Sequence, residues 1–218
     1  QNAKISIMNT TAQKNELIFG YSSGSLGEAK SLFVSMYLFL NSVAAKKASI
    51  FDNILADNLA ELKDVAPKKL SYKDCINLSS NQNSNIESVN DFNPLVSRIG
   101  NLKNLKWKSV YKGFKEFIIK LHDKDSIKLI KMDPGTSVPL HSHNGKEYIL
   151  VLDGSFCDEY GEYNKGDLQI NDQKIKHTPI ANKTNGCVCL SITENEVVFF
   201  GKFASILNLF TFIKSFFK

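Results

Sequence analysis

Two of the four histidines form the run His141-Ser142-His143, Glu147 follows His143 by four residues, and His177 lies further along the same part of the chain. Imidazole nitrogens and carboxylate oxygens are donors that bind divalent transition metals. Side chains alternate in a β-strand, so His141 and His143 point to one face, and Glu147 returns to it if the strand continues without a bulge. With His177 from a neighbouring strand, the set suits Zn(II), Fe(II), Mn(II), Ni(II) or Cu(II). The sequence therefore predicts one metal site formed by His141, His143, Glu147 and His177.

The segment that carries these residues has the pattern of a β-domain. Short runs rich in Phe, Ile, Val and Leu, at 116–121, 127–132, 148–152 and 197–200, alternate with turn signals such as Asp133-Pro134-Gly135. Strands at this spacing indicate a sandwich or barrel. We expect residues 94–218 to form an all-β domain that positions the metal ligands.

The N-terminal part has a helical pattern instead. Ser25-Leu26-Gly27-Glu28 has the form of a capping box, and no charged residue occurs between Lys30 and Lys46. A helix that is apolar around most of its circumference must be covered by other parts of the protein. Residues 9–66 are therefore predicted to form a small helical module. Part of the cover is expected from the stripe of a second helix, Ile50, Ile54, Leu55, Leu59 and Leu62.

Two further segments complete the organisation. Residues 67–93 are polar and rich in Ser and Asn, a composition that favours a linker with a flexible joint between the two parts. The tail has apolar residues at helical spacing between Phe203 and Phe217. This pattern predicts a C-terminal helix that packs on the barrel or forms an oligomer contact, in preference to a membrane anchor. The fold class is thus α+β with two domains.

Composition excludes several functions. The net charge is +5 from 27 basic and 22 acidic residues, and the lysines are scattered, so direct nucleic-acid binding is not expected. No apolar stretch reaches the roughly 18–20 residues of a membrane span. Four cysteines do not form the framework of a secreted domain, which favours a cytoplasmic location.

The metal-ligand frame resembles the first motif of the cupin superfamily, which adopts a jelly-roll barrel. That frame runs from Gly135 through the two histidines and Glu147 to Gly154, with every spacing matched. The second cupin motif is matched only in part, by Gly166 and His177. The usual Pro-x-Gly before the histidine is missing, and Ala181 stands where the last residue is commonly Asn.

More of the chain is similar to the ChrR family of anti-sigma factors. The segments that carry this resemblance are 21–29, Trp107, 154–159, 163–167, 177–179 and 186–190. The resemblance implies a transcriptional regulator whose helical module binds an extracytoplasmic-function sigma factor. It also implies that the cupin-like domain binds a metal, with Zn(II) favoured, and takes part in an oxidative-stress response.

The helical module departs from that family at its own zinc site. Tyr37, Asn41 and Ala44 stand where ligands are required, and no histidine precedes His122. Packing must replace the stabilisation that zinc ordinarily contributes. Either sigma binding persists without this zinc, or the module binds another partner.

Two alternatives remain open at the level of sequence. A metal-dependent cupin enzyme, such as a dioxygenase or hydrolase, would use the same four ligands with an open position for substrate or water. Cys187 and Cys189 point to one face of a strand and could bind metal or react with oxidants, but Cys-Val-Cys-Leu-Ser-Ile is more typical of an ordinary buried strand.

Overall fold

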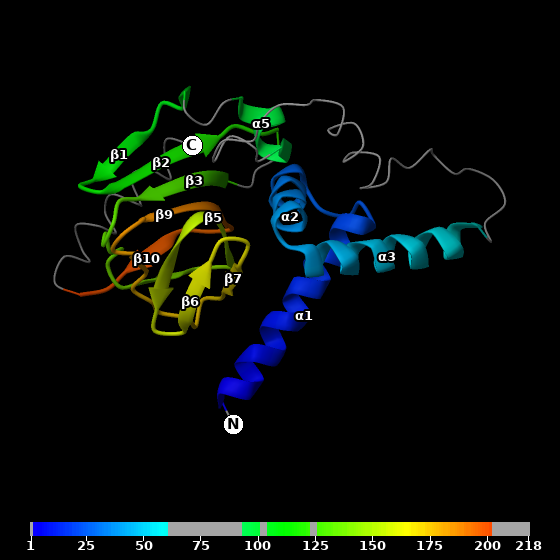
Figure 1. Cartoon of the computed structure of the whole chain (residues 1–218). Coiled ribbons are helices and arrows are strands. Elements are labelled where there is room, and N and C mark those ends of the chain that lie inside the picture. Colours follow the sequence, from blue (N-terminus) through cyan, green and yellow to red (C-terminus); the bar gives the residue numbers. More distant parts are fainter. Residues whose placement is uncertain (1, 61–92, 101–103, 123–125, 202–218) are drawn as a thin grey trace.

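The computed structural model describes residues 2–60, 93–100, 104–122 and 126–201. Helices gather on one side of a β-domain, and two of them extend away from it (Figure 1). The predicted order of a helical module before a β-domain is confirmed. Nearly all of the predicted linker and the whole predicted C-terminal helix lie outside the described residues. None of the described helices is long and apolar enough to cross a membrane.

Residues 2–60 form the three helices α1 (Asn2–Ser22), α2 (Glu28–Leu40) and α3 (Ser42–Ala60). The predicted capping box is not formed, because Gly27 is the N-cap of α2 and makes no side-chain cap hydrogen bond. Ser25 instead donates through Oγ to the carbonyl oxygen of Gly20 in α1. The hydroxyl therefore closes the α1–α2 turn.

The β-domain is built mainly from one eight-stranded sheet in the order β1-β2-β3-β9-β5-β6, with β7 and β8 both paired to β5. A separate pair joins β10 to β4, and every strand pair is antiparallel. The strands are β1 (Lys108–Tyr111), β2 (Phe114–Ile119), β3 (Ser126–Met132), β4 (His141–His143), β5 (Glu147–Asp158), β6 (Gly161–Asn164), β7 (Leu168–Asn171), β8 (Ile180–Ala181), β9 (Cys187–Thr193) and β10 (Val197–Phe199), and the short helix α5 (Asn93–Ile99) precedes them.

Strand β5 makes the corner of the domain. Its first half pairs with β7 and β9, its second half pairs with β6 and β8, and the register shifts between Val151 and Asp153. Gly154 follows this bulge with φ of 69°, and a Cβ there would lie 2.2 Å from the carbonyl oxygen of Gly186. Only glycine fits a positive φ and so close a backbone approach, which explains the last glycine of the cupin frame.

The central strands bury both of their faces. One face, including Ile149, Phe156 and Cys189, forms the interior core of the barrel. The opposite face, including Leu150 and Leu190, belongs to a second core that also contains residues of the helices. The sheet therefore has a barrel core on one side and a helix-covered core on the other.

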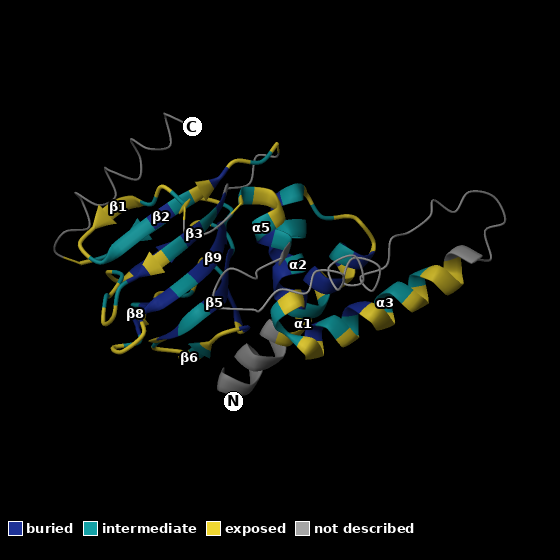
Figure 2. Cartoon of the chain, turned by 45° about the horizontal axis from the view of Figure 1, so that its top comes forward, coloured by how far each residue is buried: buried dark blue, intermediate teal, exposed yellow. Residues whose placement is uncertain are grey.

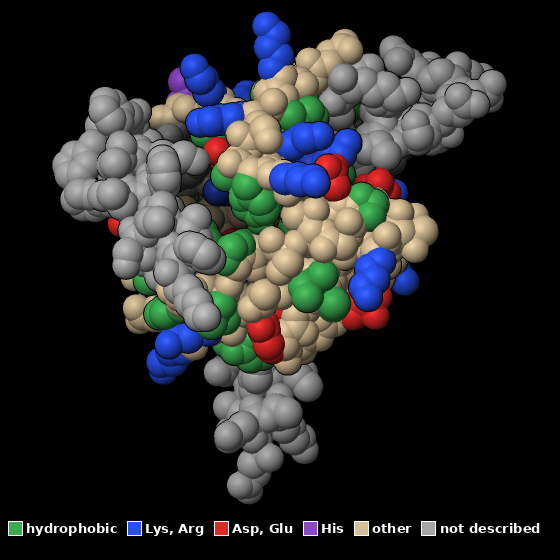
Figure 3. All heavy atoms as spheres, turned by 90° about the vertical axis from the view of Figure 1, so that its left-hand side faces the viewer, with side chains coloured by type: hydrophobic (Ala, Val, Ile, Leu, Met, Phe, Trp, Pro, Cys, Tyr) green, Lys and Arg blue, Asp and Glu red, His purple; other side chains and the backbone are tan. Residues whose placement is uncertain are grey.

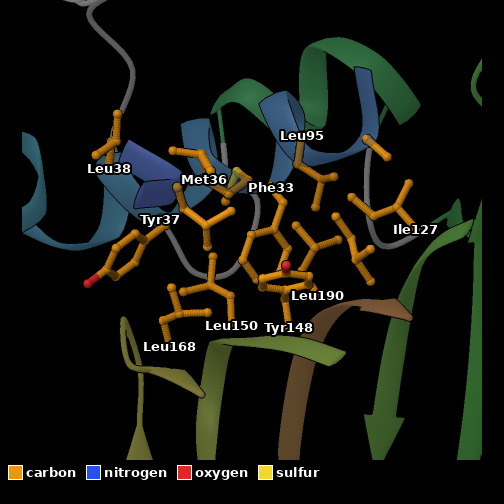
Figure 4. Packing of buried hydrophobic residues seen from close by; sticks show 14 of the residues in the cluster. Phe33, Met36, Tyr37, Leu38, Leu95, Ile127, Tyr148, Leu150, Leu168 and Leu190 are labelled. Carbon is orange, nitrogen blue, oxygen red and sulfur yellow. The ribbon is translucent and has the colours of Figure 1, made fainter. Parts of the chain in front are cut away.

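Helix α2 supplies the cover for that second face. Figure 4 shows Phe33, Met36 and Tyr37 pointing from the helix toward Leu150 and Leu168 of the sheet. The rings of Phe33 and Tyr148 meet edge to face, with centroids 6.2 Å apart. The prediction that the charge-free helix must be covered is confirmed, and the β-domain covers it.

Polar contacts accompany this packing. Lys30 Nζ lies 2.8 Å from Oε1 of Glu194, and Asn41 Nδ2 donates to the carbonyl oxygen of Gly166. The expected flexible joint between the two parts is therefore wrong for α2. The helical module lacks the zinc ligands that the resemblance implies, and its apolar side chains are buried against the sheet instead. The two parts therefore share one core.

The predicted covering stripe of the second helix is wrong for two of its members. Ile50 and Ile54 in α3 are 56% and 50% exposed, and the outer end of this helix is exposed in Figure 2. Ala44 and Ala48 form the buried contact instead. Their small side chains allow close approach to α1 and α2, which leaves the larger apolar side chains in solvent.

Candidate metal centre

The four predicted ligands come from three places in the barrel. His141 and His143 stand on β4, whereas Glu147 is the first residue of β5, and a turn separates the strands. The expectation that one strand carries three ligands is therefore wrong. His177 faces His141 through an isolated antiparallel bridge, so a neighbouring chain segment supplies it as predicted.

These four side chains converge within the barrel. All are buried, and one potential ligand atom from each lies within 4.8 Å of the others. Oε2 of Glu147 lies 2.9 Å from Nε2 of His143 and 3.7 Å from Nε2 of His177. Among the residues that the structure describes, this cluster has the composition and closeness that a metal site needs.

Two of the imidazoles are oriented by partners outside the cluster. Nδ1 of His141 donates to the carbonyl oxygen of Pro139 at 2.9 Å, and Nδ1 of His177 donates to Oδ2 of Asp158 at 2.9 Å. A carbonyl or carboxylate oxygen only accepts, so each Nδ1 carries a proton, and the neutral form of each ring presents its lone pair at Nε2. Such outer partners typically fix the tautomer of metal-binding histidines.

The two lone pairs face each other. Nε2 of His177 lies 3.1 Å from Nε2 of His141, a distance at which two unprotonated nitrogens repel unless a cation lies between them. Burial lowers the pKa of His141 to about 4, against an opposing effect of the Glu147 charge, so that imidazole is neutral at neutral pH. A divalent metal ion fits this arrangement because it binds unprotonated imidazoles.

Glu147 supplies the negative charge of the cluster. Burial alone would raise its pKa, but the neighbouring imidazoles, first of all His143, outweigh that effect and lower the pKa to about 2. Asn171 holds the carboxylate by donating from Nδ2 to Oε2 at 3.1 Å. The side chain is thus ionised and oriented before any ion binds.

The two ring nitrogens of His143 are buried and available as metal ligands. Its ring is 1% exposed, and neither ring nitrogen has a hydrogen-bond partner of suitable geometry among the described residues. A buried polar atom without a partner costs free energy, so its presence needs an explanation. Metal ligation would satisfy one of these nitrogens.

The supporting residues Asp158, Gln169 and Asn171 were not predicted from the sequence. Gln169 donates from Nε2 to Oδ2 of Asp158 at 2.7 Å, which fixes the carboxylate that orients His177. Asp158 lies 19 residues from His177 in the chain, and an acid at the end of a strand usually marks a turn. No spacing rule distinguishes it, because strand pairing alone creates the contact.

A cavity of about 350 Å³ adjoins the cluster, and His141, His143 and Glu147 form part of its lining. Most of the remaining lining is apolar and comes from β1, β2, β3, β5 and β10. Hydrophobic side chains gather beside a recess on this side of the β-domain in Figure 3. A small molecule in this cavity would therefore lie next to the cluster, although the cluster atoms are buried.

Cys187 and Cys189 lie on the same buried face of β9, as the alternation predicted. Their Sγ atoms are 3.3 Å apart, and both side chains are 2% exposed within the interior core of the barrel. A hydrogen bond with Cys187 and burial raise the pKa of the Cys189 thiol. Their burial agrees with the prediction of an ordinary core strand.

Packing and capping contacts occupy the positions where the helical module lacks zinc ligands. Tyr37 and Ala44 are buried in the shared core. Asn41 accepts at Oδ1 from the backbone N–H of Ala44 at 3.0 Å, which caps the start of α3. Side-chain packing and one cap thus connect α2 to α3.

The antiparallel barrel carries three histidines and a glutamate in its interior, which is the arrangement expected from the sequence frame that resembles the cupin motif. Residues 97–195 match the family described as the ChrR cupin-like domain. The predicted resemblance to ChrR proteins is confirmed, and the α+β fold class is confirmed with it.

Two known proteins extend the similarity beyond the barrel. The chain is 29% identical over 192 residues to the anti-sigma-E factor ChrR of Cereibacter sphaeroides, covering 84% of this chain and 89% of that protein. It also aligns with a chain in the crystal structure of Rhodobacter sphaeroides SigE in complex with the anti-sigma ChrR. That alignment has a TM-score of 0.66 and 29% identity, over 83% of this chain and 96% of the other.

Proposed function

We propose that this protein is an anti-sigma factor that binds an extracytoplasmic-function sigma factor through its helices and one metal ion through its barrel. The similarity to ChrR, which spans 84% of the chain and so extends well beyond the cupin-like domain, carries this proposal. The partner follows from the crystal structure of the similar protein with SigE. A role as regulator in an oxidative-stress response, rather than as an enzyme, follows from the same resemblance.

Zn(II) is the metal we propose for His141, His143, Glu147 and His177. Three neutral imidazoles and one carboxylate are donors that zinc accepts, and the resemblance to a zinc-binding family favours it over Fe(II), Mn(II) and Ni(II). Elemental analysis of protein purified without chelator should give one zinc per chain. A substoichiometric content that His177→Ala leaves unchanged would contradict the assignment.

The sigma factor is proposed to contact the exposed apolar stripe of α3, formed by Val43, Ile50 and Ile54. These side chains are 65%, 56% and 50% exposed, and their spacing of seven and four residues places them on one face of the helix. Figure 1 shows α3 projecting away from the β-domain, so the stripe is accessible. An exposed apolar stripe of this kind favours a protein partner.

Co-purification tests this contact with the full-length chain, because α2 folds against the sheet. The wild type should form a stable complex with a sigma factor encoded beside it. Ile50→Lys combined with Ile54→Lys should weaken binding at least about tenfold, since each places a charge in the apolar contact.

Ile118→Lys is the matched control, because Ile118 is 52% exposed on the β-domain and should not affect the complex. Equal binding by the α3 variant and the control would refute the α3 contact. Absence of any complex with the wild type would refute the anti-sigma proposal itself.

A further inference from the structure

The cavity beside the metal cluster is apolar over most of its wall. Side chains of both barrel sheets and of the loop before β4 line it, among them Phe114, Ile130, Met132, Val138, Ile149 and Phe156. A core that only needed to be filled would close such a space, since protein interiors pack to crystal-like density. Its volume of about 350 Å³ lies near the lower end for small-molecule sites, roughly 300–1,000 Å³.

Polar groups meet this cavity on the side of the metal cluster. Thr193 pairs with Glu147 across β9 and β5 and lines the same cavity. Its Oγ1 is buried and has no hydrogen-bond partner among the described residues. A hydroxyl placed there can donate to an oxygen of a ligand that approaches the cluster.

The charges of the lining define the ligand further. Within the ligand set, a divalent ion with three neutral imidazoles and the Glu147 carboxylate carries one net positive charge in a low-dielectric site. The Asp158 carboxylate that balances this charge lies behind His177, and neither residue lines the cavity, so the side of the ion that faces the cavity favours an anionic group. The other charges that line the cavity, Lys128 and Glu116, compensate each other at 3.9 Å. The part of the ligand that lies away from the metal cluster therefore meets no unpaired charge in the lining.

We propose that the cavity binds a small, mostly apolar monocarboxylate, with its carboxylate at the metal cluster and Thr193 and its hydrocarbon part against the apolar wall. At roughly 30 Å³ for each water-sized unit, 350 Å³ holds about a dozen non-hydrogen atoms. This inference rests on the metal site of the proposed function. It adds the class of ligand that this site receives.

Isothermal titration of the zinc-loaded full-length chain with straight-chain carboxylates, from butanoate to dodecanoate, tests the proposal. Affinity should rise up to about fourfold for each added CH₂ until the chain outgrows the cavity. Octanoate should bind at least tenfold more tightly than octylammonium or octanol. Removal of zinc with EDTA should abolish the preference for octanoate over octanol.

Two lining variants locate the site. Val138→Trp, from a half-buried loop position, should remove the dependence on chain length, whereas Ile118→Trp, outside the cavity, should retain it. Thr193→Val keeps the shape and removes the hydroxyl, so octanoate should bind about tenfold more weakly at unchanged zinc content.

The experiments distinguish failure of the cavity inference from failure of the metal site. Protein that contains one zinc per chain and binds no carboxylate, or binds octylammonium equally well, overturns the cavity inference and leaves the metal site standing. Protein that retains no zinc contradicts the metal site itself, which the elemental analysis reports independently. Octanoate binding that is unchanged in Val138→Trp also overturns the inference.

Discussion

Asp158 orients His177 without belonging to the four predicted ligands. Its carboxylate is fully buried and receives hydrogen bonds from His177 and Gln169, which outweigh burial and lower its pKa. Asp158→Asn removes that charge while preserving the size of the side chain. We expect metal affinity to fall about 10- to 100-fold, as is typical when such a partner is lost.

Competition with a chromogenic chelator measures this change in metal affinity. Glu162→Gln is the matched control, because Glu162 is an exposed acid on the neighbouring strand β6. Equal affinities for the two variants would show that Asp158 does not support the site.

The histidine cluster also predicts the pH dependence of the metal-free chain. His141 has a folded pKa of about 4 against an ordinary 6.5, so the unfolded chain binds more protons between these values. The free energy of unfolding should therefore fall as pH decreases from 6.5 to 4, with up to about 1.4 kcal/mol per pH unit from this residue. Glu147, with a pKa of about 2 against 4.5, extends the loss to lower pH.

Urea unfolding across this range measures the slope. His141→Asn should flatten it between pH 6.5 and 4. A slope that is the same in wild type and His141→Asn would be inconsistent with a neutral buried His141.

At the scale of elements, α2 is held by its contact with the sheet. Phe33 is 1% exposed and packs on Tyr148, whereas Phe39 on the same helix is 40% exposed. Phe33→Ala should lower the free energy of unfolding by about 3–5 kcal/mol, because it deletes a buried ring and leaves a cavity. Phe39→Ala should cost less, since 40% of that residue is already exposed in the folded state and its loss leaves no enclosed cavity.

Denaturant unfolding of both variants checks this difference. Similar losses for Phe33→Ala and Phe39→Ala would mean that α2 does not depend on the sheet for its stability.

At the scale of the whole molecule, strand β5 connects the metal cluster to the helices. Glu147 faces the cluster, while its neighbour Tyr148 packs on Phe33 and donates from its hydroxyl to Glu194, which also binds Lys30 of α2. Metal removal should loosen β5 and hence α2. We expect faster amide exchange in both elements after chelation, with α3 much less affected.

Hydrogen exchange followed by mass spectrometry provides the measurement, with the Asp158→Asn variant as a graded intermediate. Faster exchange confined to the barrel, with α2 unchanged, would exclude this route from the metal cluster to the helical module.

Much of this architecture was predictable because it depends on local pattern. The spacing of His141, His143 and Glu147 between two glycines predicted a barrel in which these side chains converge, and alternation placed Cys187 and Cys189 in its core. The absence of charge from Lys30 to Lys46 predicted a covered helix, because no isolated helix of that kind is stable in water. Each of these inferences needs only residues that are near one another in the chain.

Tertiary structure decided which partners meet. The break between β4 and β5, the support of His177 by Asp158, the cover of α2 by the β-sheet and the exposure of Ile50 all depend on contacts between segments distant in sequence. Local pattern specifies that an apolar face must be buried or that a ligand must be oriented. Which distant surface satisfies that need is set by the packing of the whole chain, because hydrophobic burial is non-directional and depends on area rather than on sequence spacing.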